Sequence, residues 1–341
     1  MDNSSQQNVP PVAQLLERIS GYWITQVIRT IAQLGVPDRL ARGPRASDEV
    51  ASELGLPADS LFRLLRGGVN AGVVQQVSPR TFALTPLGDV LRSDVPGSLR
   101  ALAIALSDPS HWLPWGRLPE AIQTGTTTTR AALGGDIWEY FSRNPEEATR
   151  FAQAMGGFSA TVASEVVRLH DFSRYARVAD IGGSEGVLLE AILRAYPSCR
   201  GILFDLPHVM AGARARIESV GLASRVELAA GSFFEPVIPA AEAYLLKHIL
   251  HDWDDAPANT ILRQLHRSAP EGARLLAVEM VMPDDGKPSS VPLMDLNMLV
   301  LVNGRERTAR EFETLFLNAS WELERITPTQ SGVSLIEARK R

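Results

Sequence analysis

The stretch KHILHDW, residues 247–253, places a histidine where a catalytic base can act. The apolar run before it predicts an inner strand of a parallel sheet. The run DDAPANTILRQLHR after it predicts a capped helix with Pro257 in its first turn. His251 then falls on the loop from strand to helix. Ligands of open α/β sheets bind at the carboxyl ends of the strands, so His251 is a candidate general base.

A second histidine, His248, precedes His251 by three residues. Continued strand alternation would place Lys247, Ile249 and His251 on one side of the sheet and His248 on the other. We therefore expect His248 to be a packing or pocket residue rather than the base. The remaining histidines show no metal-ligand spacing, and no metal is expected; they are His111, His170, His208 and His266.

The elements that position this loop are short apolar strands alternating with helices from Tyr175 onward. The strand candidates are RVADIGG, RGILFDL, RVELAAG, AYLLKHIL and RLLAVEM. Such alternation predicts an α/β fold, a Rossmann-like parallel sheet with right-handed crossovers. The last segment, WELERITPTQSGVSLIEARKR, predicts a terminal antiparallel hairpin that turns at Ser331-Gly332.

The N-terminal part predicts helix, turn, helix and hairpin, which is a winged-helix plan. Such a unit serves packing or dimerisation, or it reads DNA with its second helix. The cations of that helix are Arg63 and Arg66, with Arg80 at the wing tip, and the formal net charge is −5. This favours a homodimer and no nucleic acid. We expect a dimerisation domain at 11–97, a helical linker and substrate-pocket region at 98–175 and a catalytic domain at 176–341.

Composition and sequence pattern indicate where in the cell the protein is expected. Apolar runs such as MLVLV are far shorter than the ~20 residues that span a bilayer, so no membrane segment is expected. The polar start MDNSSQQNVPP lacks the features of a secretory signal. The single cysteine, Cys199, excludes an internal disulfide. A cytoplasmic protein is therefore expected.

The loop DIGGSEG, residues 180–186, separates the first strand of the sheet from the first helix. It does not fit the dinucleotide fingerprint, which needs a glycine at Ser184, and it lacks the Gly-Lys of a P-loop. Asp205 closes the second strand, and a carboxylate there can accept both ribose hydroxyls of a nucleoside.

These motifs together resemble one family. DIGGSEG, FDLPHV, GSFF, LLKHILHDWDD, VEMVMP and NGRERTAREFE occur in the order and spacing of the small-molecule O-methyltransferases of plants and bacteria. The resemblance implies S-adenosylmethionine as the cofactor, a helical dimerisation unit, His251 as the base, and Glu279 and Glu306 as the carboxylates beside it. The cofactor-binding residues that it implies are Gly182, Ser184, Asp205, Leu206, Ser232, Phe233 and Lys247.

The chain departs from the family at two cofactor positions. Ser184 stands where the family has a third glycine, and Ser232 stands where it has an aspartate. We expect the turn to tolerate Ser184 if its φ stays negative. A hydroxyl at Ser232 bonds an adenine amine less strongly than a carboxylate, by ~1 kcal/mol.

The resulting hypothesis is an S-adenosylmethionine-dependent O-methyltransferase acting on a hydroxyl of an aromatic or polyketide-like small molecule. Two alternatives stay open at this point. One is non-methylating chemistry, such as cyclisation or hydroxylation, on a natural-product intermediate; the other is a winged-helix DNA-binding regulator. The expected substrate-pocket residues are Trp112, Met155, Phe158, Met294, Asn297 and Met298.

Overall fold

The computed structural model describes residues 10–341; the polar start of the chain, residues 1–9, lies outside the described residues. The described chain forms two structural units. The first unit comprises the chain up to Trp112 and the segment Glu146–Gly157. The second comprises Leu113–Pro145 and Phe158–Arg341.

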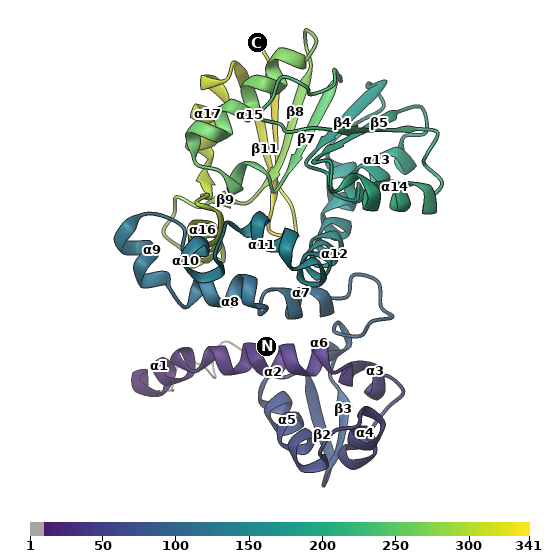
Figure 1. The fold of residues 1–341 in the computed structure, drawn as a ribbon, viewed down its shortest axis with the longest axis vertical. Helices are drawn as coiled ribbons and strands as arrows, with labels where there is room; N and C mark the ends of the chain where they lie inside the picture. Colours follow the sequence, from purple (N-terminus) through teal and green to yellow (C-terminus); the bar gives the residue numbers. More distant parts are fainter. Residues whose placement is uncertain (1–9) are drawn as a thin grey trace. The chain divides into compact units, whose positions relative to one another are not determined.

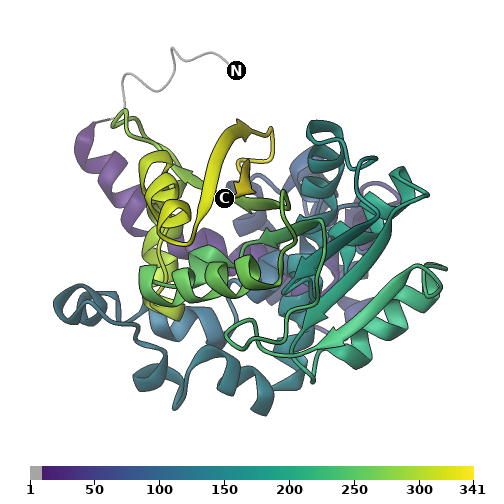
Figure 2. The same cartoon turned by 90° about the horizontal axis from the view of Figure 1, so that it is seen from above.

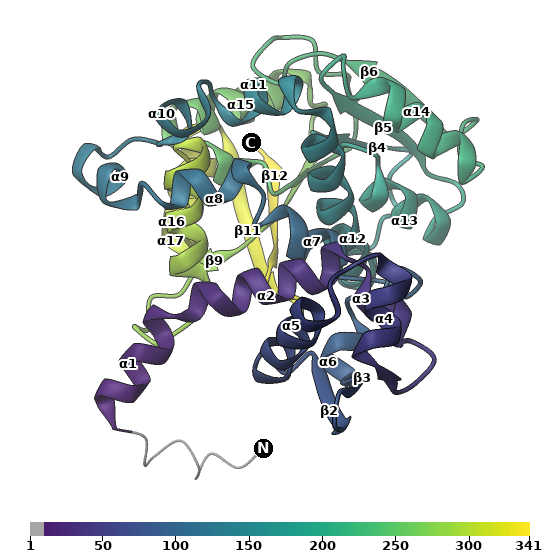
Figure 3. The same cartoon turned by 60° about the horizontal axis from the view of Figure 1, so that its bottom comes forward.

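The first unit contains the winged-helix arrangement that the sequence predicts (Figure 3). Its elements are α1 (Pro11–Ile19), α2 (Gly21–Gln33), α3 (Val36–Leu40), β1 (Arg45–Ala46), α4 (Ser47–Leu54), α5 (Ala58–Asn70), β2 (Val74–Ser78), β3 (Thr81–Leu84), α6 (Pro86–Asp89) and α7 (Arg100–Ala105). Strand β3 pairs antiparallel with both β1 and β2. Buried Ile31, Leu61, Leu65 and Phe82 join the helices to this small sheet. The predicted first helix is divided at Ser20 into α1 and α2.

Along the described chain, five further helices come before the first strand of the large sheet. They are α8 (Pro109–Trp115), α9 (Leu118–Thr124), α10 (Thr129–Leu133), α11 (Ile137–Arg143) and α12 (Pro145–Leu169). Helix α11 begins with a capping box, in which Asp136 accepts from the backbone N–H of Glu139 and the Glu139 side chain accepts from that of Asp136. Helix α12 contributes residues to both units.

The second unit is built on an α/β sheet. Its strands are β4 (Arg177–Ile181), β5 (Arg200–Asp205), β6 (Val226–Ala230), β7 (Ala243–Lys247), β8 (Arg274–Glu279), β11 (Trp321–Pro328) and β12 (Ser334–Lys340). Its helices are α13 (Val187–Ala195), α14 (Met210–Ser219), the 3-10 turn η2 (Leu250–Asp252), α15 (Asp255–Ser268), α16 (Val291–Val302) and α17 (Ala309–Asn318). Short strands β9 (Val281–Met282) and β10 (Arg307–Thr308) pair separately and in parallel.

The strand order of the large sheet is β11-β12-β8-β7-β4-β5-β6 (Figure 1). Strands β8, β7, β4, β5 and β6 run parallel. In the terminal hairpin, yellow in Figure 2, β12 pairs antiparallel with β8, and β11 pairs antiparallel with β12 at the edge of the sheet. The parallel sheet and the terminal hairpin are both as predicted.

Side-chain alternation divides the core between the two faces of the sheet. On β7, Tyr244 and Leu246 pack with α15 and α17, while Ala243 and Leu245 pack with α12, α13 and α14. Helices therefore cover both faces, and β4, β5, β7 and β8 are buried over most of their length, whereas the edge strand β6 is partly exposed. Among residues 10–341, no helix combines the length and the apolar character needed to cross a bilayer.

Candidate active site

The segment that carries His251 leaves the sheet earlier than the sequence predicted. Strand β7 ends at Lys247, and the next residue, His248, has a left-handed backbone with φ of 53°. The chain then turns into η2, which contains His251. Because alternation stops at Lys247, the prediction that His248 faces the opposite side is wrong. The centroids of the His248 and His251 rings lie 5.0 Å apart.

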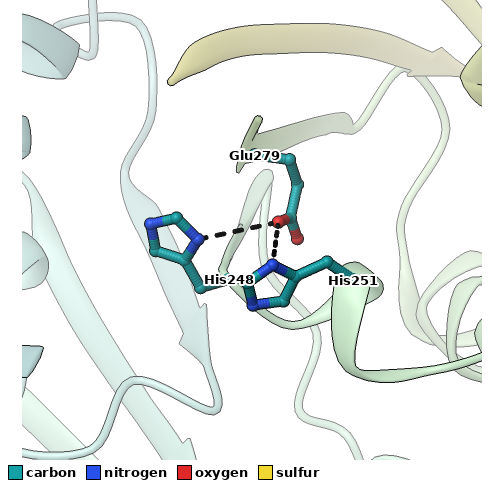
Figure 4. Close-up of side chains that lie close together, drawn as sticks. All are labelled: His248, His251 and Glu279. Atoms are coloured by element: carbon teal, nitrogen blue, oxygen red, sulfur yellow. Dashed lines mark ion pairs between the residues drawn. The ribbon is translucent and has the colours of Figure 1, made fainter. Parts of the chain in front are cut away.

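Glu279, the last residue of β8, holds this turn in place. Strand β8 lies parallel to β7, so the two strands end at the same edge of the sheet. Oε1 of Glu279 accepts hydrogen bonds from the backbone N–H groups of Ile249, at 3.0 Å, and Leu250, at 2.8 Å. Its other oxygen, Oε2, lies 3.8 Å from Nδ1 of His251 (Figure 4). The carboxylate thus fixes the backbone of the turn and adds negative charge beside the imidazole.

Glu306 contacts the imidazole directly. Nδ1 of His251 lies 2.8 Å from Oε1 of Glu306, and both side chains are buried. A carboxylate oxygen accepts, so Nδ1 is the donor and carries the proton. The backbone N–H of Glu306 donates in turn to Oδ1 of Asp295 on α16, at 2.8 Å. This geometry leaves Nε2 of His251 as the atom able to take a proton from a substrate.

Nearby carboxylates raise the pKa of His251 by more than burial lowers it. Burial lowers the pKa of His251, but the charges of Glu279, Glu306 and Asp252 raise it from 6.5 to about 9. Burial also raises the pKa of Glu279 to about 7 and that of Asp252 to about 6. His248 differs, because burial and the nearby positive charges of Lys247 and His251 hold its pKa well below 6.5.

Two further residues, Arg307 and Gly304, contact the turn that carries His251, and neither was predicted from the sequence. Arg307 is fully buried, and its guanidinium donates to the carbonyl oxygens of Leu250 and Trp253, both at 2.8 Å. Its Nε also donates to Oδ1 of Asp255. Gly304 approaches so closely that an added Cβ would lie 2.0 Å from the carbonyl oxygen of His251. The only sequence signal was their place beside Glu306 in NGRER.

The expected cofactor residues lie on neighbouring parallel strands. Asp205 ends β5, next to β4 and the glycine turn that follows it. Its Oδ2 accepts from the backbone N–H of Ser184, at 2.8 Å, and its Oδ1 accepts from that of Leu206, at 2.7 Å. Each oxygen keeps a lone pair for a further donor. Burial raises the pKa of Asp205, and these two hydrogen bonds oppose that rise.

The turn after β4 is tighter than expected. Gly182 has φ of 68°, and a Cβ there would lie 2.5 Å from Cδ1 of Ile249. We expected the turn to tolerate a serine at position 184 if its φ is negative. The φ of Ser184 is 53°, so that condition is not met. A side chain in the left-handed region is strained by roughly 1–2 kcal/mol.

The remaining cofactor candidates follow the ends of β6 and β7. Ser232 and Phe233 follow β6 after Gly231, and the Phe233 ring packs edge-on against Phe234 and Trp253. Lys247 ends β7, and burial lowers its pKa, although the negative charge of buried Asp180 opposes this.

The residues present fit a nucleoside cofactor. A rim carboxylate, Asp205, keeps acceptor capacity for a ribose diol, and the aromatic ring of Phe233 suits the flat face of a base. Burial raises the pKa of nearby Asp180 to about 7, and the positive charge of Lys247 opposes that rise.

The expected pocket residues divide between the units. Met294, Asn297 and Met298 share one side of α16, and Oδ1 of Asn297 accepts from the indole N–H of Trp115, at 2.7 Å. Trp112 and Met155 belong to the first unit, where the Trp112 ring lies beside Tyr22. The side chain of Phe158 lies outside the described part of the structure.

The order of the sheet and its terminal hairpin is the methyltransferase fold. The chain matches the model of an O-methyltransferase domain over residues 115–322 and that of an O-methyltransferase dimerisation domain over residues 16–94. It therefore belongs to the O-methyltransferase family. The protein is an S-adenosylmethionine-dependent O-methyltransferase, so neither the non-methylating nor the regulatory alternative is supported.

Individual relatives cover nearly the whole chain. The phenazine O-methyltransferase PhzM of Lysobacter antibioticus is 40% identical over 338 residues, 99% of each chain. The mitomycin biosynthesis 6-O-methyltransferase of Streptomyces lavendulae is 35% identical over 94% of this chain and 93% of its own.

Solved structures of O-methyltransferases also match nearly the whole chain. The crystal structure of LaPhzM matches with a TM-score of 0.92 at 40% identity, over 98% of this chain and 100% of its own. NcsB1, an O-methyltransferase from neocarzinostatin biosynthesis, was solved with S-adenosylmethionine and 2-hydroxy-5-methyl naphthoic acid. It matches with a TM-score of 0.80 at 31% identity, over 94% of this chain and 96% of its own.

Proposed function

We propose that this methyltransferase acts on a hydroxyl of a fused-ring aromatic metabolite, with His251 as the general base. The observation that carries the proposal is the 2.8 Å contact between Nδ1 of His251 and Oε1 of Glu306. It fixes the ring orientation and directs Nε2 away from Glu306; Oδ1 of Asp252 lies 3.5 Å from Nε2. Glu279 supports the same orientation by holding the backbone of η2.

The chemistry required of the protein is proton removal and alignment. When bound, S-adenosylmethionine supplies an electrophilic methyl carbon, and the acceptor's new carbon–oxygen bond forms as the carbon–sulfur bond breaks. The hydroxyl proton passes to Nε2 of His251. A phenol has a pKa of about 10, and the pKa of His251 is about 9, so this transfer is nearly balanced in energy. Glu279 and Glu306 stabilise the imidazolium that forms.

The acceptor class is supported by the relatives and by the pocket candidates. The names of the similar proteins include a phenazine O-methyltransferase, and NcsB1 was solved with a naphthoic acid. Met294, Met298 and Trp115 give α16 and its neighbour the apolar and aromatic surface that suits flat rings. Asn297 adds a polar group among them. We therefore favour hydroxyphenazines and hydroxynaphthoates as acceptors.

The test is a methyl-transfer assay on the full chain. Purified protein, S-adenosylmethionine and a panel containing a hydroxyphenazine, a hydroxynaphthoate and a non-aromatic alcohol should give S-adenosylhomocysteine with the aromatic members. His251→Ala should lower kcat by about 10²- to 10⁴-fold. His266→Gln, a histidine of α15 outside the site, serves as the matched control. A His251→Ala enzyme with the full rate would refute the base assignment.

We further propose a homodimer formed through the N-terminal unit. The dimerisation model matches residues 16–94, and α1 has no buried residue within the protomer. Its exposed apolar residues are Val12, Leu15, Leu16 and Ile19. The expected domains at 11–97, 98–175 and 176–341 and a cytoplasmic location, inferred from a single cysteine, remain part of this proposal.

A further inference from the structure

Two imidazoles and one carboxylate converge at the end of β7 and β8 (Figure 4). Nδ1 of His248 and Nδ1 of His251 each lie 3.8 Å from Oε2 of Glu279. One potential ligand atom from each residue lies within 4.8 Å of the other two. The left-handed φ of His248 brings the two rings together, and nothing in the sequence spacing predicted this.

The carboxylate oxygen between the rings has unused acceptor capacity. Glu279 is fully buried, and its Oε1 is committed to the backbone of η2. Its Oε2 has no hydrogen-bond partner among the described residues. A buried carboxylate oxygen without a donor is unfavourable, so the site gains free energy from a cation placed there.

We propose that His248, His251 and Glu279 bind a divalent transition-metal ion such as Zn²⁺, and that the bound ion inhibits methyl transfer. Two imidazole nitrogens and a carboxylate oxygen are ligands that Zn²⁺ takes at about 2.0–2.2 Å. One ion bridges two atoms 3.8 Å apart, because two such bonds together exceed that distance. A modest rotation of the rings brings the two nitrogens within the same reach. Imidazole ligands favour Zn²⁺ over Mg²⁺ or Ca²⁺.

Inhibition follows from the atom that the ion occupies, and this step rests on the proposed role of His251 as base. The ion binds Nδ1 of His251, the atom that donates to Glu306. The N–H bond breaks, its proton leaves to solvent, and a nitrogen–metal bond replaces it. The charge of the ion then withdraws electron density from the ring and weakens Nε2 as a base. The hydrogen bond that orients the ring is lost at the same time.

The binding experiment uses the full chain without a polyhistidine tag, freed of metal by a chelator and measured without cofactor or substrate. Titration with Co²⁺, followed by visible absorption and calorimetry, should give one ion per chain. His248→Gln should weaken this binding at least tenfold, and His266→Gln should not. No Co²⁺ binding up to millimolar concentration, or equal binding by His248→Gln, would overturn the proposal. Because no turnover is involved, this result is independent of whether His251 is the base.

The activity experiment titrates Zn²⁺ into the methyl-transfer assay. Each variant's rate is divided by its own rate in chelator, so any effect of His248→Gln on catalysis itself cancels. The wild-type rate should fall at least tenfold at saturating Zn²⁺, and the half-inhibitory concentration should rise at least tenfold in His248→Gln. Zn²⁺ binding without loss of rate would refute the inhibitory role.

Discussion

Nδ1 of His251 lies 2.8 Å from Oε1 of Glu306, although 55 positions separate the two residues in the chain. The contact joins the turn after β7 to the segment between α16 and α17. Loss of either partner's charge should therefore change the basicity of Nε2, the atom proposed to receive the proton.

Replacing Glu306 by glutamine should lower kcat by about 10- to 100-fold, less than loss of the imidazole itself. The amide can still accept from Nδ1, so the ring keeps its orientation, but it no longer stabilises the imidazolium. Steady-state kinetics on a hydroxyphenazine measure the effect. Glu313→Gln, an exposed carboxylate of α17, is the control. An unchanged kcat in Glu306→Gln would contradict the role of this contact.

The pH dependence of kcat/KM should reflect the raised pKa of His251. A base must be neutral, and with a pKa of about 9 His251 is mostly protonated at pH 7. The rate should therefore rise by roughly tenfold per pH unit from pH 7 and level off near pH 9. The facing groups are Glu279, Glu306, Asp252 and His248.

Glu279→Gln separates the enzyme's titration from that of the substrate. Removing this negative charge lowers the pKa of His251, so the midpoint of the profile should move to lower pH. The ionisation of the acceptor is the same in both enzymes, so a difference in midpoint belongs to the protein. Identical midpoints would exclude His251 as the group that titrates.

Arg307→Met should destabilise the fold and impair catalysis together. It removes the N–H groups that donate to the carbonyl oxygens of Leu250 and Trp253, at a cost of about 1–3 kcal/mol for each oxygen left without a donor. Denaturant unfolding measures the loss, with exposed Arg310→Met as control. In the folded fraction kcat should fall more than KM rises, because the turn carrying His251 loosens. Stability equal to wild type would refute the anchoring role.

The sequence predicted the sheet, its terminal hairpin and the place of His251, because these depend on local apolar patterns and on ordered motifs. It could not place His248, since the alternation rule presumes that β7 continues, whereas the strand ends at Lys247. Arg307 was also missed. An arginine near a helix start is usually exposed, and only the three-dimensional fold reveals the carbonyl oxygens that surround it.

Ser184→Gly should stabilise the protein slightly. The left-handed φ of Ser184 strains its side chain by roughly 1–2 kcal/mol, and glycine removes that strain. Glycine also gives the unfolded chain more entropy, which offsets about 0.4–1 kcal/mol, so the net gain lies between zero and about 1.6 kcal/mol. Ser184→Ala keeps the Cβ and should give no such gain. If Ser184→Gly and Ser184→Ala had equal free energies of unfolding, backbone strain at this position would not explain any gain in stability.

The double variant Leu16→Asp with Ile19→Asp should convert the proposed dimer to a monomer. Both residues lie on one side of α1 with Leu15 and Val12, and they are 60% and 62% exposed in the protomer. Charges there stay solvated in the isolated chain, but they disfavour burial against a second copy. Light scattering at micromolar concentration should give half the wild-type mass, with thermal stability of the protomer retained. Val77→Asp, an exposed apolar residue of β2, should leave the mass unchanged. A monomeric wild type would remove the basis for the dimer, and a dimeric double variant would move its interface away from α1.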